Sequence, residues 1–430
     1  MRIAALFSLF LGVGLAVAAD WPQFRGPQRD GISRETGVLK SWPKDGPKLL
    51  WTYREGGLGF SGPAIIGGRL YTMGGFDKDE YVIAIDLTKQ KELWRVKVGK
   101  LFSHGAWGDG PRSTPTVDGD RVYALGGFGD LVCVDTSGKE VWRKSYADMG
   151  GEMMSEWGFS ESVLIDGDLL ICTPGGDKGT LAALDKKTGN ELWRSKELKN
   201  KAPYSSVMIS MAGGSKQYVQ TSYINDDDGG VVSGFAPGGK VLWTQPIFKG
   251  HSYAIAPNPI IKDDLVYVSS GYGAGCHLFQ LTAKGKVAFD AKDLYPKKIQ
   301  KTVKNTHGGI VLIGDHIYGH SEGLGWVCQD LKSGEIAWSE RSKLETRSGS
   351  ITSADGMLYL LAETGDLALI APDPKGWQEA GAFKLPEQSK LRTTLANLRS
   401  AAVWTHPVVA NGRLYLRDQE LIFCYDVSGK

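Results

Sequence analysis

One repeated unit dominates the sequence and limits the folds that the chain can adopt. Each copy contains a Gly or Asp turn, a strand centred on Tyr, a strand ending in Asp, a second Gly turn and a strand that carries Trp. The Tyr positions are roughly 40 to 56 residues apart, which is the length of one four-stranded propeller blade. Clear copies of the first half lie at residues 66–71, 118–123, 263–267, 354–359 and 410–415.

The repeat predicts an all-β fold, an eight-bladed β-propeller with four antiparallel strands in each blade. Alternating apolar residues in the strands fit sheets that are buried on both faces. Eight copies follow Ser61, but the last one, residues 408–427, has only three strands. Residues 49–54 resemble the outermost strand of the first copy, residues 92–97. We therefore expect this N-terminal strand to complete the last blade and close the ring, which removes the exposed sheet edges.

The N-terminus has the pattern of an export signal. Arg2 is followed by an apolar stretch at residues 3–17 and then by small residues, the order that a signal peptidase recognises. No cysteine follows the cleavage region, so we expect a periplasmic or secreted protein without a lipid anchor. The predicted organisation is a signal peptide at 1–19, cleaved near Ala18 or Ala19, an N-terminal extension at 20–47 and a single propeller domain at 48–430.

The charge balance argues against nucleic acid as a partner. Lys plus Arg number 50 against 48 for Asp plus Glu, so there is no bulk positive field to attract a phosphate backbone. The apolar stretch of the leader is marginal for a bilayer, so we expect no membrane span. We expect the mature chain to be a monomer.

The five cysteines do not indicate a disulfide framework, because their number is odd and none are close neighbours in the sequence. Cys133, Cys328 and Cys424 occupy one repeat position, where sister copies have Ala84 and Ala183. We therefore expect buried thiols that act as small apolar side chains.

The connections between blades are the predicted location of a site. Strands alternate in direction within a blade, so these connections share one face of the ring, and several are long and hold four of the seven histidines. Loops on a rigid scaffold are where binding groups concentrate, so we expect a ligand or partner site on this inter-blade-loop face. The candidate residues are His104, Trp107, Arg112, Trp157, His251, Tyr253, His307, Arg347, Trp404 and His406.

The chemistry of this set suits a planar, anionic cofactor. Arg side chains could pair with carboxylates and Trp rings could stack on the ligand. Glu161 and Asn305 could contact a hard cation such as Ca²⁺. The alternative, that polar side chains at the mouth of the ring only hydrogen-bond neighbouring loops, stays open for each residue.

The repeats resemble those of the pyrroloquinoline quinone (PQQ) propeller family, whose blades carry the signature Ala-x-Asp-x-x-Thr-Gly-x-x-x-Trp. Residues 183–193 follow this pattern, residues 84–94 share its Ala, Asp and Trp, and the resemblance covers roughly residues 48–427. The segments 21–27, 110–115 and 404–426 are similar to exported PQQ-like proteins, a quinoprotein-like group that includes BamB-like and polyvinyl-alcohol-dehydrogenase-like members.

The resemblance implies two alternative functions. The first, which we favour, is a non-catalytic periplasmic scaffold for binding or assembly with an envelope protein or peptide as partner, because the chain lacks the adjacent cysteine pair of alcohol-oxidising quinoproteins. The second is a PQQ- and Ca²⁺-dependent dehydrogenase that oxidises an alcohol or sugar. In that case Asp109 or Glu161 would take the substrate proton.

Overall fold

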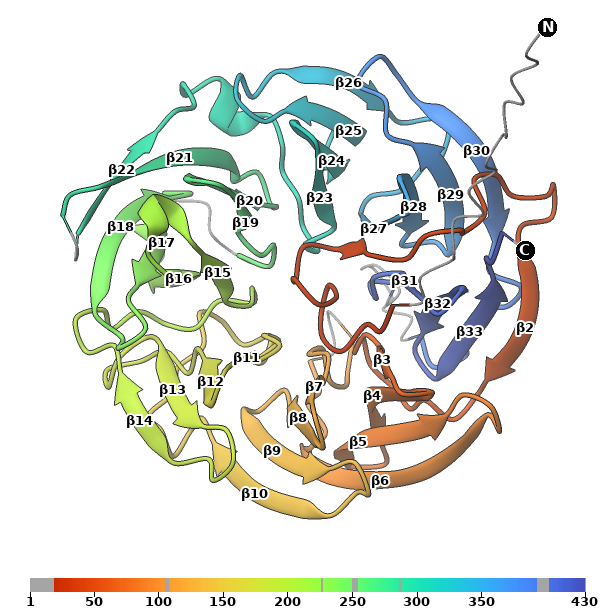
Figure 1. Cartoon of the computed structure of the whole chain (residues 1–430), viewed down its shortest axis with the longest axis horizontal. Coiled ribbons are helices and arrows are strands. Elements are labelled where there is room, and N and C mark those ends of the chain that lie inside the picture. Colours follow the sequence, from red (N-terminus) through yellow and green to blue (C-terminus); the bar gives the residue numbers. More distant parts are fainter. Residues whose placement is uncertain are drawn as a thin grey trace, which may run out of the picture.

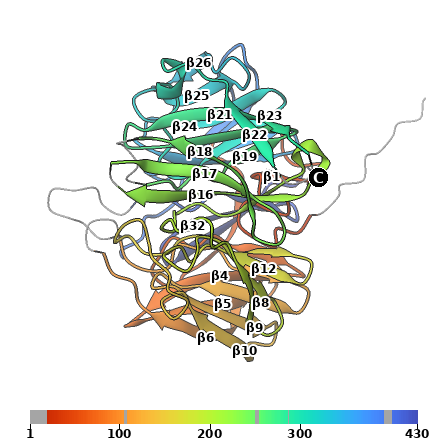
Figure 2. The same cartoon turned by 90° about the vertical axis from the view of Figure 1, so that its left-hand side faces the viewer.

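The strands of the chain form eight sheets arranged as blades around a central channel (Figure 1). The structure is a computed structural model that describes residues 19–104, 108–225, 227–249, 254–285, 288–392 and 402–429. Seen from the side, the blades form one layer around the channel (Figure 2). The described residues contain no α-helix and two short 3-10 helices. The prediction of an all-β, eight-bladed propeller is confirmed.

Blades 1 to 4 each consist of four strands, which follow one another from the channel outward. They are β3 (Ala64–Ile66), β4 (Arg69–Phe76), β5 (Asp79–Asp86) and β6 (Lys91–Lys100); β7 (Thr116–Asp118), β8 (Arg121–Leu125), β9 (Asp130–Asp135) and β10 (Glu140–Ser145); β11 (Leu164–Asp166), β12 (Leu169–Cys172), β13 (Ala182–Asp185) and β14 (Glu191–Arg194); and β15 (Met208–Ser210), β16 (Gln217–Asn225), β17 (Gly229–Phe235) and β18 (Val241–Ile247). The 3-10 helix η1 (Ala212–Gly214) lies between β15 and β16.

Blades 5 to 8 repeat this arrangement, with two strands from the N-terminal part of the chain. They are β19 (Ile260–Lys262), β20 (Leu265–Ser270), β21 (Gly275–Ala283) and β22 (Phe289–Asp293), followed by η2 (Ile299–Lys301); β23 (Ile310–Ile313), β24 (His316–Ser321), β25 (Gly325–Asp330) and β26 (Ile336–Glu340); β27 (Gly349–Ala354), β28 (Met357–Ala362), β29 (Asp366–Ala371) and β30 (Gln378–Lys384), with β1 (Ile32–Ser33) added to β27; and β31 (Val408–Ala410), β32 (Arg413–Asp418), β33 (Leu421–Asp426) and β2 (Lys48–Tyr53).

The N-terminal strand β2 closes the ring, as predicted. It pairs antiparallel with β33, from Lys48 opposite Asp426 to Tyr53 opposite Ile422. Blade 8 thereby obtains its fourth strand, and its sheet no longer ends at an open edge. The prediction that an N-terminal strand closes the ring is therefore confirmed.

Arg417 of β32 fastens blade 8 to blade 1 at this joint. Its side chain is buried, with 1% exposure, and its Nη1 donates to the carbonyl oxygens of Ser61 and Met73. Its Nη2 donates to the carbonyl oxygens of Gly56 and Gly57. Burial lowers the pKa of the Arg417 guanidinium to about 9, so it remains charged at neutral pH. Because this buried charge needs the carbonyl oxygens beside it as acceptors, it favours the one packing of blades 8 and 1 that supplies them.

We expect Arg417→Met to destabilise the protein by at least about 3 kcal/mol, because it leaves buried carbonyl groups without a donor. Arg413→Met is the matched control on the same strand, since Arg413 is 34% exposed and pairs with Asp426 at 2.7 Å. A partly exposed pair of this kind contributes about 1 kcal/mol. Urea denaturation of both variants measures the difference, and equal losses would contradict the role given to Arg417.

The Trp and Asp of each repeat join neighbouring blades. Trp94 of blade 1 donates to the carbonyl oxygen of Thr136 at 3.1 Å, in the blade 2 turn that Asp135 organises. Trp142 of blade 2 makes the equivalent bond to Lys186 of blade 3. Gly138, with φ of 93°, lies under Trp94, where an added Cβ would approach the ring to 2.6 Å. The signature residues of the repeat are thus used for turn formation and blade packing.

Glu80 is a buried acid at the interface of blades 1 and 2. Its Oε1 accepts from the amide of Phe102, and its Oε2 accepts from the amide of Gly127 at 2.9 Å. Burial outweighs these bonds and raises the pKa of the Glu80 carboxyl to about 7. In the unfolded chain the same group titrates near its ordinary pKa of 4.5. Between these two values the folded state binds more protons than the unfolded state.

We expect the free energy of unfolding to lose up to about 3 kcal/mol from Glu80 as the pH rises from about 4.5 to about 7. Glu80→Gln keeps the side-chain volume and cannot ionise. The stability of the wild type relative to this variant should therefore fall over that pH range. Denaturation of both proteins at several pH values measures it, and a constant difference would contradict the raised pKa.

All five cysteines are buried, and none takes part in a disulfide. Burial raises the pKa of the Cys133 thiol to about 12, which makes it unreactive at neutral pH. The prediction of buried thiols that act as apolar side chains is confirmed.

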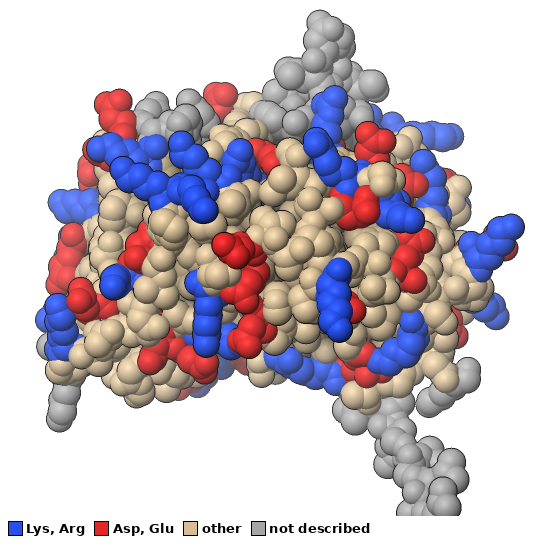
Figure 3. Space-filling view, turned by 90° about the horizontal axis from the view of Figure 1, so that it is seen from above, with Lys and Arg blue, Asp and Glu red and all other residues tan. Residues whose placement is uncertain are grey.

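Positive and negative side chains are intermixed over most of the outer wall seen in Figure 3, with one group of Lys and Arg at its upper left. None of the helices among the described residues is long and apolar enough to cross a membrane. Residues 1–18 of the predicted leader, which ends at residue 19, lie outside the described residues, and the leader stays a prediction.

The segment between Trp21 and Trp42 lies across the channel (Figure 1). We call it the channel segment. Its β1 pairs parallel with β27, Ile32 opposite Ser353, and the backbone of Trp21 pairs with that of Ile65 in blade 1. Arg25 donates to the carbonyl oxygens of Gly308 at 2.9 Å and Ile310 at 2.5 Å, in blade 6. The channel segment thus contacts blades on opposite sides of the ring and divides the channel.

Candidate functional site

A pocket opens on the inter-blade-loop face, above the channel segment. It is rich in aromatic side chains and is built by the channel segment together with connections that lead into seven of the eight blades. Its lining residues are Trp21, Phe24, Arg25, Phe60, Gly62, Pro63, Arg112, Thr114, Trp157, Ser160, Ser162, Tyr204, Ala254, Ala256, Tyr272, Thr306, His307, Trp404, Thr405, His406 and Val408. We call it the loop-face pocket.

The floor of the pocket comes from the channel segment. Trp21 is 2% exposed, and the ring of Phe24 lies 5.3 Å from the ring of His406. Arg25 has φ of 61°, a left-handed conformation that is unusual for a residue with a side chain. Its hydrogen bonds to blade 6 hold that conformation. The channel segment therefore keeps one position and closes the bottom of the pocket.

One wall is made by three aromatic residues from different blades. The ring of Trp157 is stacked with that of Tyr204, with centroids 5.8 Å apart, and is tilted against that of Tyr272 at 6.0 Å. Tyr272 has φ of 55°, and its amide donates to the carboxylate of Glu322 at 2.8 Å. Strained residues that the structure holds in place are frequent at binding sites. The repeat pattern did not single out Tyr204 or Tyr272.

The opposite wall is built around Trp404. Its ring is stacked with that of His307, with centroids 4.6 Å apart, and with that of Phe60, at 4.9 Å. Its Nε1 donates to Glu363 at 3.3 Å. Two protein rings thus already stack on this indole, which is partly exposed.

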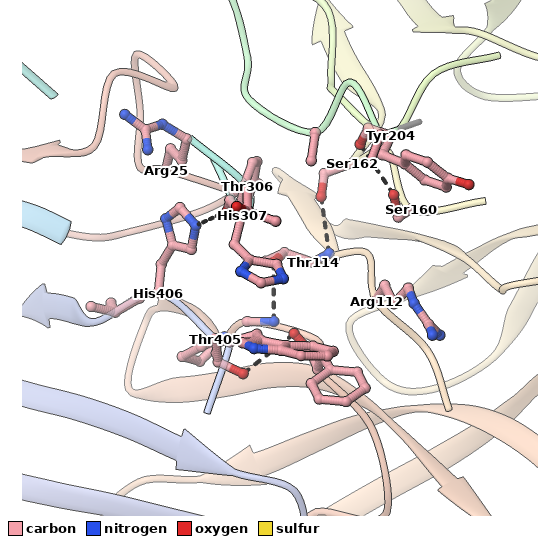
Figure 4. A pocket seen from close by; sticks show the side chains of 18 of the residues that line it. Arg25, Arg112, Thr114, Ser160, Ser162, Tyr204, Thr306, His307, Thr405 and His406 are labelled. Atoms are coloured by element: carbon pink, nitrogen blue, oxygen red, sulfur yellow. Dashed lines mark hydrogen bonds between the residues drawn. The ribbon is translucent and has the colours of Figure 1, made fainter. Parts of the chain in front are cut away.

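The two histidines of this wall are engaged with the protein. His307 Nδ1 is 2.9 Å from Ser348 Oγ. His406 Nε2 is 3.1 Å from the carbonyl oxygen of His307, a contact shown in Figure 4. Burial and the nearby Arg25 lower the pKa of the His406 imidazole to about 3. His406 is therefore neutral at physiological pH and donates one hydrogen bond within the wall.

The guanidinium groups of Arg25 and Arg112 point away from the middle of the pocket in opposite directions (Figure 4). Arg112 donates to the carbonyl oxygens of Gly110 at 2.9 Å and Gly108 at 2.8 Å, and it lies over the ring of Phe102 at 5.1 Å. Burial lowers the pKa of the Arg112 guanidinium to about 10. Arg112 therefore holds its own loop and contributes positive potential to the pocket from one side.

Small polar residues at the rim link successive blades by one hydrogen bond each. The amide of Gly62 donates to Thr114 Oγ1, and the amide of Thr114 donates to Ser162 Oγ. The amide of Ser162 donates in turn to Ser206 Oγ, and the amide of Ser206 donates to Asn258 Oδ1. This chain of bonds runs from blade 1 to blade 5 and fixes the spacing of the loops that carry the pocket.

Five of the predicted site residues line the loop-face pocket, namely Arg112, Trp157, His307, Trp404 and His406. His104, Asp109, Glu161, Asn305 and Arg347 are not among its lining residues, and Arg347 is exposed. Trp107, His251 and Tyr253 lie outside the described residues. Phe24 and Arg25 were missed as site residues, although both belong to the segment 21–27 that carries part of the family resemblance.

The carboxylates suggested for proton transfer are bound within the scaffold. Asp109 Oδ1 accepts from the hydroxyl of Ser103 and the amide of His104, both at 2.9 Å. Glu161 Oε1 accepts from the hydroxyl of Tyr146 at 2.7 Å and from the amide of Thr173. Burial raises the pKa of the Glu161 carboxyl. Both groups are therefore engaged in loop and blade contacts.

The residues present do not fit a Ca²⁺-bound PQQ in the loop-face pocket. Asn305 donates to the carbonyl oxygen of His320 in blade 6 at 2.9 Å, whereas the partners of Glu161 belong to blades 2 and 3. No Asp or Glu lines the pocket within the described chain. The same residues contain no group of three or more His, Cys, Asp or Glu that could hold a metal ion. The described lining residues therefore offer no carboxylate ligand to Ca²⁺.

The fold and the pocket define an eight-bladed propeller of the quinoprotein-like class, with an aromatic pocket among its inter-blade loops. A family model described as outer membrane protein assembly factor BamB matches residues 78–340, more than half of the chain. The chain belongs to this family.

A curated protein with the same family description is also similar to this chain. The outer membrane protein assembly factor BamB of Shewanella oneidensis is 26% identical over 256 residues, 56% of this chain and 56% of that protein. The match thus spans little more than half the length of this curated relative.

Two solved structures share the fold. Quinohemoprotein alcohol dehydrogenase from Comamonas testosteroni is similar with a TM-score of 0.67 over 97% of this chain and 82% of that protein, at 13% identity. BamB from Moraxella catarrhalis is similar with a TM-score of 0.57 over 88% of this chain and 97% of that protein, at 14% identity. At such identity the likeness shows the fold alone.

We expect PQQ and Ca²⁺ to leave the purified protein unchanged. A ligand present at a hundredfold its Kd would stabilise the folded state by about 2.7 kcal/mol. Thermal unfolding with and without the pair should therefore coincide, and dye reduction with alcohols or sugars should be absent. A PQQ-dependent dehydrogenase treated in parallel is the positive control. A shifted quinone spectrum together with a raised melting temperature would contradict this interpretation of the pocket.

Proposed function

We propose that this protein is a non-catalytic binding scaffold of the cell envelope, and that its partner or ligand site is the loop-face pocket. The observation that carries the proposal is the chemistry of the lining. Aromatic rings from several blades provide apolar surface, while the histidines and arginines are already bonded to the protein. Such a lining favours binding of an apolar or aromatic group over acid–base chemistry.

The shape of the site supports a scaffold. The amides and hydroxyls of the rim residues form hydrogen bonds between blades. These bonds give the pocket its shape before a partner binds, so binding costs little conformational entropy. Aromatic residues in a fixed pocket are typical anchors of protein interfaces. A protruding side chain of an envelope protein or peptide would fit this description.

Family membership supports a location in the envelope. The Shewanella and Moraxella relatives are named as an outer membrane assembly factor and as BamB, respectively. The predicted leader at residues 1–19 is in keeping with export. We propose a periplasmic or secreted protein that acts as a monomer on this basis.

Oxidation of an alcohol or sugar with PQQ is the less well supported alternative. The likeness to the Comamonas dehydrogenase favours it, but that likeness is one of fold. Trp404 already stacks with Phe60 and His307, and neither Asp109 nor Glu161 lines the pocket. The proposal of a scaffold needs neither a cofactor nor a proton acceptor.

Site-specific photo-crosslinking tests the proposal. A benzophenone amino acid is placed at Tyr272 in the pocket wall and, as the matched control, at Leu93, which is 42% exposed on the outermost strand of blade 1. After irradiation in cells, crosslinked proteins are identified by mass spectrometry. We expect one recurring envelope protein from the Tyr272 position and none from Leu93.

A second variant shows whether the pocket itself is the binding element. Ala256 lines the pocket and is partly exposed, so Ala256→Trp should fill it and reduce the crosslink at least tenfold while the protein stays folded. Crosslinks at Tyr272 no different from those at Leu93, or unaffected by Ala256→Trp, would overturn the proposed function.

A further inference from the structure

A second hollow lies on the opposite face of the ring, on the other side of the channel segment. Its volume is about 840 Å³. The innermost strands of blades 3 to 6, β11, β15, β19 and β23, form one side, and the channel segment forms the other. Its lining residues include Gln28, Asp30, Ile165, Ile209, Met211, Ile261, Asp263 and Leu312. We call it the channel hollow.

The channel segment shows how the innermost strands bind an extended chain. The amide of Ile65 donates to the carbonyl oxygen of Trp21 at 2.8 Å, and the amide of Val117 donates to that of Pro22 at 2.8 Å. The amide of Ser353 donates to that of Gly31 at 2.9 Å, next to the parallel pairing of β1 with β27. In blades 1, 2 and 7, the channel-side edge of the innermost strand is thus hydrogen-bonded to the backbone of the channel segment.

These three residues share one register position. Each follows the residue that lies opposite the repeat tyrosine, as Ala64 lies opposite Tyr71. In blade 5, Ile260 lies opposite Tyr267, so Ile261 holds the same position. Its amide and carbonyl therefore face the channel, as those of Ile65 do.

The edge of β19 is left open. Within the described chain, no strand, bridge or backbone hydrogen bond joins the channel side of β19, and β15 is likewise an edge strand. All three residues of β19 are partly exposed, whereas β3, β7 and β31 each contain at least two buried residues. An open strand edge with unpaired N–H and C=O groups is a template for another chain.

The side chains around this edge select for an apolar segment. Ile165, Ile209 and Leu312 are partly exposed in the hollow, and Met211 is 59% exposed. At the rim, Asp263 is exposed and takes part in no ion pair among the described residues. A basic residue beside an apolar stretch would complement this carboxylate.

We propose that the channel hollow binds an extended apolar peptide segment of another protein, which adds as a strand to β19 and places a basic residue at Asp263. Main-chain hydrogen bonds provide the attachment, and the apolar pockets between Ile209, Ile261 and Leu312 provide the selectivity. The mode of binding is the one that the chain's own β1 uses at β27. This site is separate from the loop-face pocket.

The test uses a fluorescent peptide of alternating valine and threonine with one terminal lysine, and its binding to the full chain is followed by anisotropy. A peptide N-methylated at alternate residues has the same side chains but cannot pair as a strand. We expect saturable binding of the first peptide and at least tenfold weaker binding of the second. Equal binding of the two would overturn strand addition.

Variants locate the binding edge. Ile261→Pro removes only the channel-facing amide, so it should weaken binding about fivefold or more, while the conservative Ile261→Val should leave it unchanged. Asp263→Asn should weaken binding of the lysine peptide and not of a peptide that ends in alanine. Asn suits the left-handed φ of 52° at this position.

Two results would overturn the proposal. One is full-strength binding by a folded Ile261→Pro variant, as judged by circular dichroism. The other is equal weakening of the lysine peptide and the alanine peptide by Asp263→Asn, which would leave no basic residue of the peptide at Asp263. Loss of crosslinking at Tyr272 would leave this peptide assay unaffected, so the two sites are tested separately.

Discussion

The pairing of β2 with β33 is the interaction on which the rest of the structure depends. It converts a row of eight sheets into a ring, so that every blade is packed between two neighbours. The joint is reinforced by Arg417, whose buried charge is shared among carbonyl groups of blade 1 and of the connection that leads into it. A buried guanidinium without acceptors would be costly, so the joint is stable only in the arrangement that supplies these acceptors. The inter-blade bonds of Trp94 and Trp142 then repeat around a ring that is already closed.

A closed ring of this size has a central channel. The N-terminal extension crosses this channel and determines which surfaces it presents for binding. Arg25 and Arg29 both have left-handed backbone conformations, with φ of 61° and 58°, and both donate to carbonyl groups of innermost strands or the loops before them. These bonds hold the extension across the channel. One side of the extension forms the floor of the loop-face pocket. Its other side borders the channel hollow, where the edge of β19 is open. A single segment of chain thus creates two different surfaces.

The sequence predicted the blades because their signature has a direct physical cause. Trp94 needs a glycine beneath it in the next blade, so the Trp and the Gly turn recur together. It also predicted that the inter-blade loops meet, and Arg112, His307 and Trp404 do line one pocket. It could not predict which way a loop turns its side chains: Asp109 bonds back to its own loop. Tyr204 and Tyr272 lie outside the repeat signature, and the extension has no repeat at all, so nothing in the pattern indicated its course through the channel.

In this member of the BamB family, a rigid ring has a pocket on one face and a partly filled channel on the other. Amide hydrogen exchange tests the central feature, the division of the channel, most directly. The amides of Ile65, Val117 and Ser353, which bond to the extension, should exchange slowly, while that of Ile261 at the same register position should exchange fast. Equal exchange at the four amides would contradict the course of the extension on which both sites depend.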